Sequence, residues 1–300
     1  MGRLHTKSSK GTLLETDLAG AYSNFVELDG VQIQYEFAKG KNKKTLLVLL
    51  HGFGANTFSY RKILKQLSVY GDVLSYDRPC FGLTVRPKSW QGTNPYSYKA
   101  QLEILGNLID HFGKNKQVIL FGHSAGASIA AEWAFANKDR VKALVFEDPA
   151  ILTVPPVSPF LSKVVKTKPF DYLGPRLVTG FKKAGTKILY KSWFDQNGIT
   201  KEVLDGYYLP LEIKGWEAAF WEFMRSGNQA TIQNNLKKLK TPVLVITGDH
   251  DEIVPVKDSV EVAKRLPKSQ LVKVENCGHI PHEEKPEEFL GAFKDFISQL

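Results

Sequence analysis

The sequence predicts an α/β protein built on a mostly parallel sheet with helices on both faces. Short apolar runs of the kind that form buried parallel strands alternate with longer segments whose apolar residues recur at helical spacing. The alternation stops after Pro149 for about ninety residues and then resumes, which indicates an insertion into one fold.

The first elements are a hairpin and then strand–helix pairs. Phe25 to Leu28 and Val31 to Phe37 flank Asp29-Gly30, a two-residue turn former, and the second segment alternates apolar and polar residues. The next elements expected are strands over Thr45 to Leu50, Val73 to Tyr76, Gln117 to Phe121 and Val141 to Glu147, separated by helices over Thr57 to Tyr70, Ser97 to Phe112 and Ala127 to Asn137. After the insertion come strands over Pro242 to Thr247 and Gln270 to Val274 and helices over Val256 to Leu266 and Pro286 to Leu300.

The insertion, residues 151–240, is expected to be helical and to form a cap. Glycine and proline are expected to break its helices at Pro155-Pro156, Gly174-Pro175, Gly180, Gly198 and Gly215. Three tryptophans fall in it, and we expect it to lie over the carboxyl edge of the sheet, where ligands bind in open α/β sheets. Residues 23–150 and 241–300 then form the core, and residues 1–22 an N-terminal tail.

Composition and charge restrict the class of protein. With 300 residues, 43% hydrophobic and 24% charged, the balance is that of a globular chain. The net charge is +9, and residues 151–240 hold 14 Lys and Arg against 7 Asp and Glu. This surplus could attract anionic substrates or give weak contact with an anionic membrane surface, without stable insertion, or it could simply be a solvated face. No nucleic-acid module accompanies the charge, so nucleic acid is not an expected partner.

The sequence contains two cysteines, Cys80 and Cys277, and they imply no disulfide framework. The first twenty residues lack the apolar core of a signal peptide, and no apolar run reaches about 18 residues. We therefore expect a cytoplasmic protein.

The most informative motif is Gly122-His123-Ser124-Ala125-Gly126, directly after an apolar strand and before a helix. A strained strand-to-helix turn holds a serine hydroxyl away from its own backbone and close to a base, which a weak nucleophile requires. The two glycines are expected because a Cβ would collide where the turn doubles back.

Four landmarks in order resemble the α/β-hydrolase fold. They are His51-Gly52-Phe53-Gly54 after the third strand, the turn at Ser124, Gly248-Asp249-His250-Asp251 after the seventh strand and Gly278-His279 after the eighth. The resemblance covers the chain from about Phe25 to Leu300 and implies an eight-stranded, mostly parallel sheet with a helical cap inserted after strand 6.

The resemblance implies a catalytic triad of Ser124, His279 and Asp251. Three other histidines were weighed as the base: His282, expected to face solvent; His123, expected to point to the opposite side of the turn; and His51 in the oxyanion loop. For the acid, Asp249 is expected to cap its own turn, and Asp148 lies after the sixth strand, where some relatives place the acid. The backbone amides of Phe53 and Ala125 would form the oxyanion hole, with Ala125 at a helix start.

Side chains near the triad are expected to line the substrate pocket. The candidates are His51, Gly52, His123, Trp193, Trp216, Trp221 and Phe223. Cys80 replaces a small residue usual in the family's loop after the fourth strand, and we have no functional interpretation of it. We expect no metal site, since no ligand cluster remains once the triad is removed, and no cofactor.

These residues predict a serine hydrolase that cleaves a small to medium carboxylic ester through an acyl-enzyme. Two alternatives stay open. The same triad serves hydrolysis of a carbon–carbon bond in a vinylogous diketone, and a non-catalytic ligand receptor could keep the fold. A serine at position 124 disfavours dehalogenase and epoxide-hydrolase chemistry, which uses aspartate at that position.

Overall fold

The computed structural model describes residues 2–3, 11–14, 24–153, 164–227 and 230–300. Within these residues the chain forms an eight-stranded sheet in the order β10-β9-β8-β7-β4-β5-β3-β2. The strands are β2 (Asn24–Leu28), β3 (Val31–Ala38), β4 (Thr45–Leu50), β5 (Asp72–Tyr76), β7 (Gln117–His123), β8 (Val141–Glu147), β9 (Val243–Gly248) and β10 (Ser269–Val274). Strands β4, β5 and β7 to β10 pair in parallel, whereas β3 pairs antiparallel with both β2 and β5, which confirms the predicted fold class.

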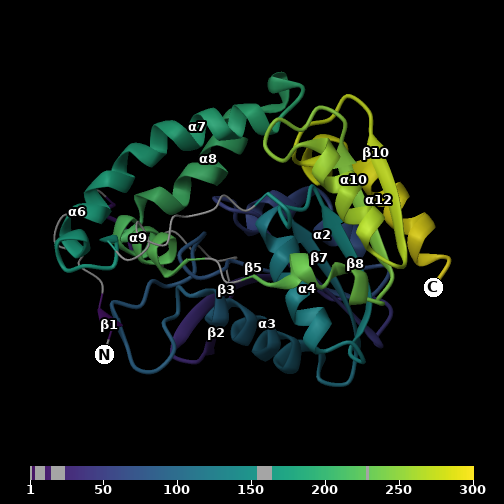
Figure 1. Ribbon diagram of the computed structural model, residues 1–300, viewed down its shortest axis with the longest axis horizontal. Coiled ribbons are helices and arrows are strands. Elements are labelled where there is room, and N and C mark those ends of the chain that lie inside the picture. The colour runs from purple at the N-terminus through teal and green to yellow at the C-terminus, as the bar shows by residue number, and fades with distance from the viewer. Residues whose placement is uncertain (1, 4–10, 15–23, 154–163, 228–229) are drawn as a thin grey trace.

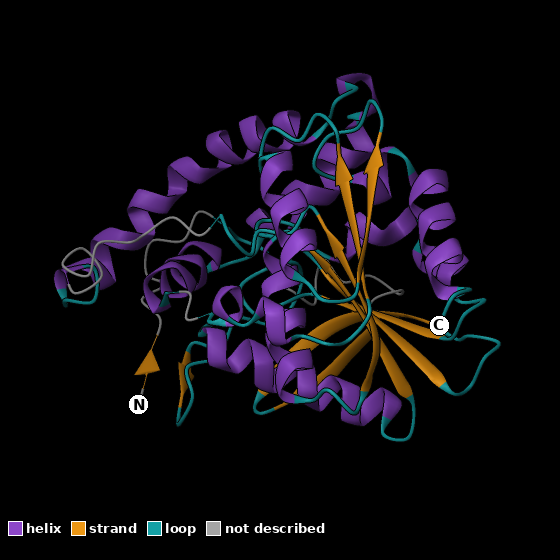
Figure 2. Cartoon of the chain, turned by 45° about the vertical axis from the view of Figure 1, so that its right-hand side comes forward, coloured by secondary structure: helices purple, strands orange, loops and turns teal. Residues whose placement is uncertain are grey.

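Alternate residues of the central strands pack into two separate cores. Leu46, Val48 and Leu50 of β4 pack with residues of α3 (Tyr98–Gly113), α4 (Ala125–Ala136) and α10 (Val256–Arg265). Leu47 and Leu49 pack on the other face with α2 (Leu64–Leu67) and α12 (Pro286–Ile297). The two-residue period of a strand sends neighbours to opposite faces, so a fully apolar run becomes buried on both sides. The helices of both layers flank the sheet in Figures 1 and 2.

One core helix differs from the expectation. Residues Thr57 to Tyr70 form a 3-10 helix, η2 (Thr57–Lys62), and the short α2, instead of one α-helix. Asn56 caps η2 through the N–H of Phe58, and Lys62 donates to the carbonyl of Glu283 at 2.8 Å. Contacts with a segment far along the chain therefore fix this region. The spacing of apolar residues within Thr57 to Tyr70 carries no information about such contacts.

Between β8 and β9 the chain leaves the sheet and forms four α-helices within the described residues, which we name the cap helices. They are α6 (Pro169–Leu177), α7 (Phe181–Ser192), α8 (Lys201–Tyr208) and α9 (Trp216–Ser226), with the 3-10 turns η3 (Val178–Gly180), η4 (Gln196–Gly198), η5 (Leu209–Glu212), η6 (Ile232–Asn234) and η7 (Leu236–Lys238) among and after them. Figure 1 shows the cap helices as one group beside the sheet.

The expected break at Gly174-Pro175 is wrong, because both residues lie inside α6. A Cβ on Gly174 would come within 1.9 Å of the Trp221 ring, so close packing on α9 explains the glycine. The expected break at Pro155-Pro156 lies outside the described residues. Gly180 ends η3, Gly198 ends η4, and Gly215 precedes α9 with a positive φ of 87°.

The described parts of the N-terminal segment contact the rest of the chain. β1 (Gly2–Arg3) pairs antiparallel with β6 (Ser89–Trp90), and Leu13 forms a bridge with Ile213. The Leu13 carbonyl also accepts from the N–H of Lys214 at 2.8 Å. The contacts of Leu13 attach this part of the segment to the loop that leads into α9.

Two glycines let β7 turn directly into α4. A Cβ on Gly122 would lie 2.4 Å from the Cα of Ala127, and one on Gly126 would lie 2.2 Å from the carbonyl oxygen of Leu50. Real Cβ atoms do not approach backbone this closely. The turn therefore needs glycine on both sides of Ser124, as the motif predicts.

We expect Gly126→Ala to lower the free energy of unfolding by about 1–3 kcal/mol, because the added methyl group must displace the end of β4. Gly291→Ala is the matched control, since a Cβ at this position of α12 meets nothing within 4 Å. That control should gain about 0.5–1 kcal/mol from helix propensity. Chemical denaturation of both variants measures the difference, and equal stabilities would contradict the packing argument.

Candidate active site

Ser124 occupies the turn between β7 and α4 in a strained backbone conformation. Its φ is 52° and its ψ is −118°, a combination that non-glycine residues rarely adopt. Strain of this kind persists only where the surroundings impose it, and it concentrates at functional sites. The turn makes the buried Ser124 part of the wall of an internal cavity that His279 also lines.

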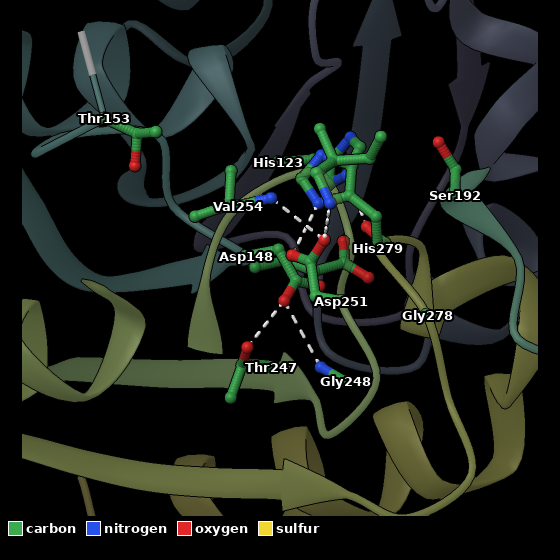
Figure 3. A network of polar contacts seen from close by, with 12 residues as sticks. His123, Asp148, Thr153, Ser192, Thr247, Gly248, Asp251, Val254, Gly278 and His279 are labelled. Atoms are coloured by element: carbon green, nitrogen blue, oxygen red, sulfur yellow. Dashed lines mark hydrogen bonds and ion pairs between the residues drawn. The ribbon is translucent and has the colours of Figure 1, made fainter. Parts of the chain in front are cut away.

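His279 and Asp251 form a buried pair beside this cavity. His279 Nδ1 lies 2.7 Å from Asp251 Oδ2 (Figure 3). The other oxygen, Asp251 Oδ1, accepts from the N–H groups of Ile253 at 2.7 Å and Val254 at 3.0 Å. The carboxylate is thus fixed by its own loop, and it holds the imidazole so that Nε2 is left for a reacting proton.

Both backbone polar groups of His279 are held by other segments. Its N–H donates to the carbonyl of Ser192 at the end of α7 over 2.7 Å. Its carbonyl accepts from His123 Nε2 at 2.9 Å, and the two rings lie 4.8 Å apart. Figure 3 shows His279 between His123 and Ser192. The prediction that His123 points to the opposite side of the turn is therefore wrong.

The other two histidines have contacts of a structural kind. His51 Nε2 accepts from the N–H of Arg78 at 3.0 Å, so its Nδ1 donates to the Gly52 carbonyl at 2.8 Å. Burial, with the Arg78 charge second, holds the pKa of His51 well below its usual value. His282 was expected to face solvent but is fully buried, and its Nδ1 donates to Glu147 at 2.8 Å. It does not line the cavity.

Two further carboxylates lie near the triad acid. Asp249 accepts from His250 Nδ1 at 2.7 Å and from the N–H of Cys277 at 3.2 Å, so it ties its loop to the one that carries His279. Asp148 is fully buried and accepts from the Thr247 hydroxyl at 2.6 Å and the Gly248 N–H at 3.2 Å (Figure 3). Burial, and secondarily the charge of Asp251, raises the pKa of Asp148 well above its usual value.

The three ligand-type atoms of Asp148, Asp251 and His279 lie within 4.8 Å of one another. An ion bound between His279 and Asp251 would need to replace their 2.7 Å hydrogen bond. The Asp251 oxygens are also bound to two N–H donors. The cluster therefore fits a hydrogen-bonded pair of His279 and Asp251 better than a cation site.

The loop after β4 lies beside the turn at Ser124. The Gly52 carbonyl accepts from His51 Nδ1 and from Arg78 Nη2, the latter at 2.9 Å. In a trans peptide the carbonyl and the next N–H point in opposite directions, so the N–H of Phe53 is directed away from these donors. A Cβ on Gly52 would lie 3.1 Å from the Cβ of Ser124, which places this peptide beside the turn. Ala125 follows Ser124 as the first residue of α4.

The cavity has a volume of about 340 Å³ and mostly apolar walls. Of the residues expected to line it, His123 and Trp216 do so, together with Phe53. The other expected residues do not line it, and these are His51, Gly52, Trp193, Trp221 and Phe223. Trp193 packs with Leu189 and Val203, and Trp221 stacks on Phe170. Phe223 packs against Phe53 and Phe81.

Several residues that sequence reasoning missed complete the cavity wall. They include Cys80, Phe81, Arg86, Leu189, Tyr207, Leu211, Phe220 and Ile280. Burial raises the pKa of the Cys80 thiol to about 12, so this thiol is not a nucleophile at neutral pH. A larger groove of about 840 Å³ lies against α3 and the turn at Asp29, but neither Ser124 nor His279 lines it. The smaller cavity is therefore the candidate active site.

The fold and this site define a class of protein: an α/β enzyme with a nucleophile turn after a central strand. The α/β hydrolase fold family matches residues 45–286, and the chain belongs to this family. Hydrolase activity is the activity that the family and its named members share.

Three known proteins show the range of these similarities. The chain is 27% identical to the uncharacterized hydrolase YugF of Bacillus subtilis, over 90% of this chain and 96% of that protein. It is 26% identical to the proline iminopeptidase of Saccharolobus solfataricus, over 90% of each. The crystal structure of a membrane phospholipase A superposes with a TM-score of 0.71 at 26% identity, covering 95% of this chain and 88% of that one. No helix in the described residues is long and apolar enough to cross a membrane.

We expect Asp148→Asn to leave the acid limb of the pH profile of kcat/KM unchanged. That limb reports deprotonation of the catalytic base in the free enzyme. If Asp148 is already neutral, the substitution changes no charge near His279. If Asp148 were ionised, the substitution would remove a negative charge beside the base and move the limb to lower pH. Asp251→Asn is the contrasting variant and should lower kcat by about 10⁴.

Proposed function

We propose that this protein is a serine hydrolase that cleaves a small to medium carboxylic ester through an acyl-enzyme. The observation that carries the proposal is that Ser124 and His279 line one apolar cavity, with His279 oriented by the buried Asp251. This combination supplies a nucleophile, a base and an apolar surface for an acyl chain.

In the proposed reaction Ser124 Oγ attacks the ester carbonyl carbon while His279 Nε2 takes the hydroxyl proton. The tetrahedral oxyanion accepts hydrogen bonds from the N–H groups of Phe53 and Ala125. Collapse breaks the bond to the leaving alkoxide, which takes the proton from His279 and departs as an alcohol. Water, deprotonated by His279, then attacks the acyl-enzyme and releases the acid and Ser124.

The cavity wall favours an ester over the peptide substrate of an aminopeptidase. A free α-amino group requires a carboxylate partner when it is buried. Glu252 is the one carboxylate among the lining residues; its side chain is 64% exposed and pairs with Lys191 at 3.3 Å. We therefore prefer an acyl ester although one similar protein is a proline iminopeptidase.

Arg86 favours a second candidate, hydrolysis of a carbon–carbon bond in a substrate that carries a carboxylate. Its buried guanidinium lines the cavity and donates to the carbonyls of Gly82 at 3.0 Å and Thr84 at 3.1 Å. A fixed cation in an otherwise apolar wall is a suitable partner for a dienoate. A panel of p-nitrophenyl esters of increasing acyl length beside one meta-cleavage dienoate separates the two reactions.

We expect a fluorophosphonate probe to label the native protein at Ser124 alone. Ser128→Ala is a matched control, because Ser128 is also buried and lies one turn further along α4 but does not line the cavity. That variant should label normally, while Ser124→Ala should not label. His279→Ala should lower kcat by at least about 10², the contribution of a general base.

Failure of the folded protein to react with fluorophosphonates of several sizes would favour the receptor alternative. If His279→Ala retained more than about a tenth of the wild-type rate, the base would have been assigned wrongly.

We expect Trp216→Ala to shift the preferred acyl chain to greater length. Trp216 lines the cavity, so loss of its indole leaves room for further methylene groups. Each additional buried methylene is worth about 0.8 kcal/mol, or about fourfold in kcat/KM. Trp221→Ala is the control: Trp221 covers Gly174 outside the cavity, so its loss should lower stability without shifting chain preference. The same shift in both variants would contradict this placement of the wall.

A further inference from the structure

The positive charge of the cap is concentrated in one segment. Residues 163–191 contain eight Lys and Arg residues and one acidic residue, Asp171. Residues 192–240 contain six basic and six acidic residues and are balanced. The one acid of the basic segment is paired with Arg225 of α9. The whole charge surplus of residues 151–240 thus belongs to α6, α7 and the residues that lead into them.

Helix α6 exposes apolar side chains among these charges. Leu173 is 50% exposed and Leu177, one turn later, is 66% exposed. Arg176 lies beside them on the exposed side of α6, and α6 packs on α9 through its other side. Figures 1 and 2 show α6 and α7 following one another along the outer border of the cap. Exposed leucines one turn apart form an apolar patch within a cationic surface.

Helix α7 has two stripes with different surroundings. Gly185, Leu189 and Ser192, at helical spacing, line the catalytic cavity. On the side away from the cavity, Lys187 and Lys191 are exposed. Lys191 pairs with Glu252, and both side chains remain more than half exposed, so this pair contributes little and can exchange partners.

Ile188 connects the two surfaces. It is 38% exposed and also lines the cavity, so it marks a place where the cavity reaches the outer surface of α7. A molecule resting against the outer stripe of α7 would therefore lie at the rim of the cavity that contains Ser124.

We propose that the outer surface of α6 and α7 docks on an anionic lipid membrane. Leu173 and Leu177 enter the headgroup region, and Arg176 of α6 with Lys187 and Lys191 of α7 meets anionic headgroups. Lysines combined with exposed leucines fit a lipid surface, which offers both negative charge and an apolar layer beneath it. This docking goes beyond the proposed reaction and does not depend on turnover. It would present acyl chains at the rim near Ile188.

The test is co-sedimentation of the full-length protein with vesicles of phosphatidylcholine alone and of an equimolar mixture with phosphatidylglycerol. Ser124→Ala is used throughout so that hydrolysis does not alter the vesicles. We expect binding to the anionic vesicles only, weakening as salt rises. A double variant, Lys187→Gln with Lys191→Gln, should bind about 25-fold more weakly, at about fivefold per lysine near the surface. Leu173→Ser with Leu177→Ser should lose at least about tenfold.

Matched controls lie away from the cap. Lys114→Gln with Lys138→Gln removes the same charge from exposed sites, and Val69→Ser removes an apolar side chain that is also about half exposed. Both should bind as the parent does. Equal binding to neutral and anionic vesicles, or equal loss in cap and control variants, would overturn the proposal. A third outcome would also overturn it: the protein binds no vesicles but dimerises as its concentration rises, and the leucine variant abolishes the dimer. The patch would then be an interface between copies of this chain.

Discussion

The two hydrogen bonds that hold the backbone of His279 are the constraint on which the site depends. One comes from the cap, through the carbonyl of Ser192, and the other from the core, through the ring of His123. Glu284 adds to the first by accepting from the N–H groups of Gly278, at 2.8 Å, and of Asp195, at 2.6 Å. A Cβ on Gly278 would lie 2.3 Å from the Ser192 carbonyl oxygen, so glycine permits the approach. The cap helices therefore position His279 as well as lining the cavity.

A second consequence concerns the buried charge beneath the site. Glu147 is the last residue of β8 and Asp148 follows it with a positive φ of 42°, and both are buried. Glu147 meets His282, whereas Asp148 meets Thr247. Glu147 gains a ring donor at 2.8 Å, whereas burial raises the pKa of Asp148 well above its usual value and so favours its neutral form. Each arrangement lowers the cost of burying a carboxyl group away from solvent.

Apolar runs in the sequence were sufficient for the strands, and the motif around Ser124 was sufficient for the turn between strand and helix. Asp251 and His279 were assigned by the resemblance to the α/β-hydrolase fold, and the structure places them within a hydrogen bond of each other. The features that sequence reasoning missed depend on partners far along the chain. His282 stands beside Glu283 and Glu284 and looks exposed, but its partner Glu147 is 135 residues away. Trp221 and Trp193 could not be sorted from Trp216 by composition, because all three are buried or half-buried aromatics of one segment and differ only in what they cover.

Helix α7 has three roles, and different residues of the helix carry each of them. One stripe, with Leu189, forms cavity wall; its last residue, Ser192, holds His279; and the opposite stripe carries Lys187 and Lys191 outward. Since residues three and four apart share a face of a helix, substitutions on one stripe leave the other stripe in place. Movement of the whole helix is different, because it would change the wall and the hydrogen bond to His279 together. A surface that fixed the outer stripe would thus stabilise the arrangement in which Ser192 holds His279 beside the cavity.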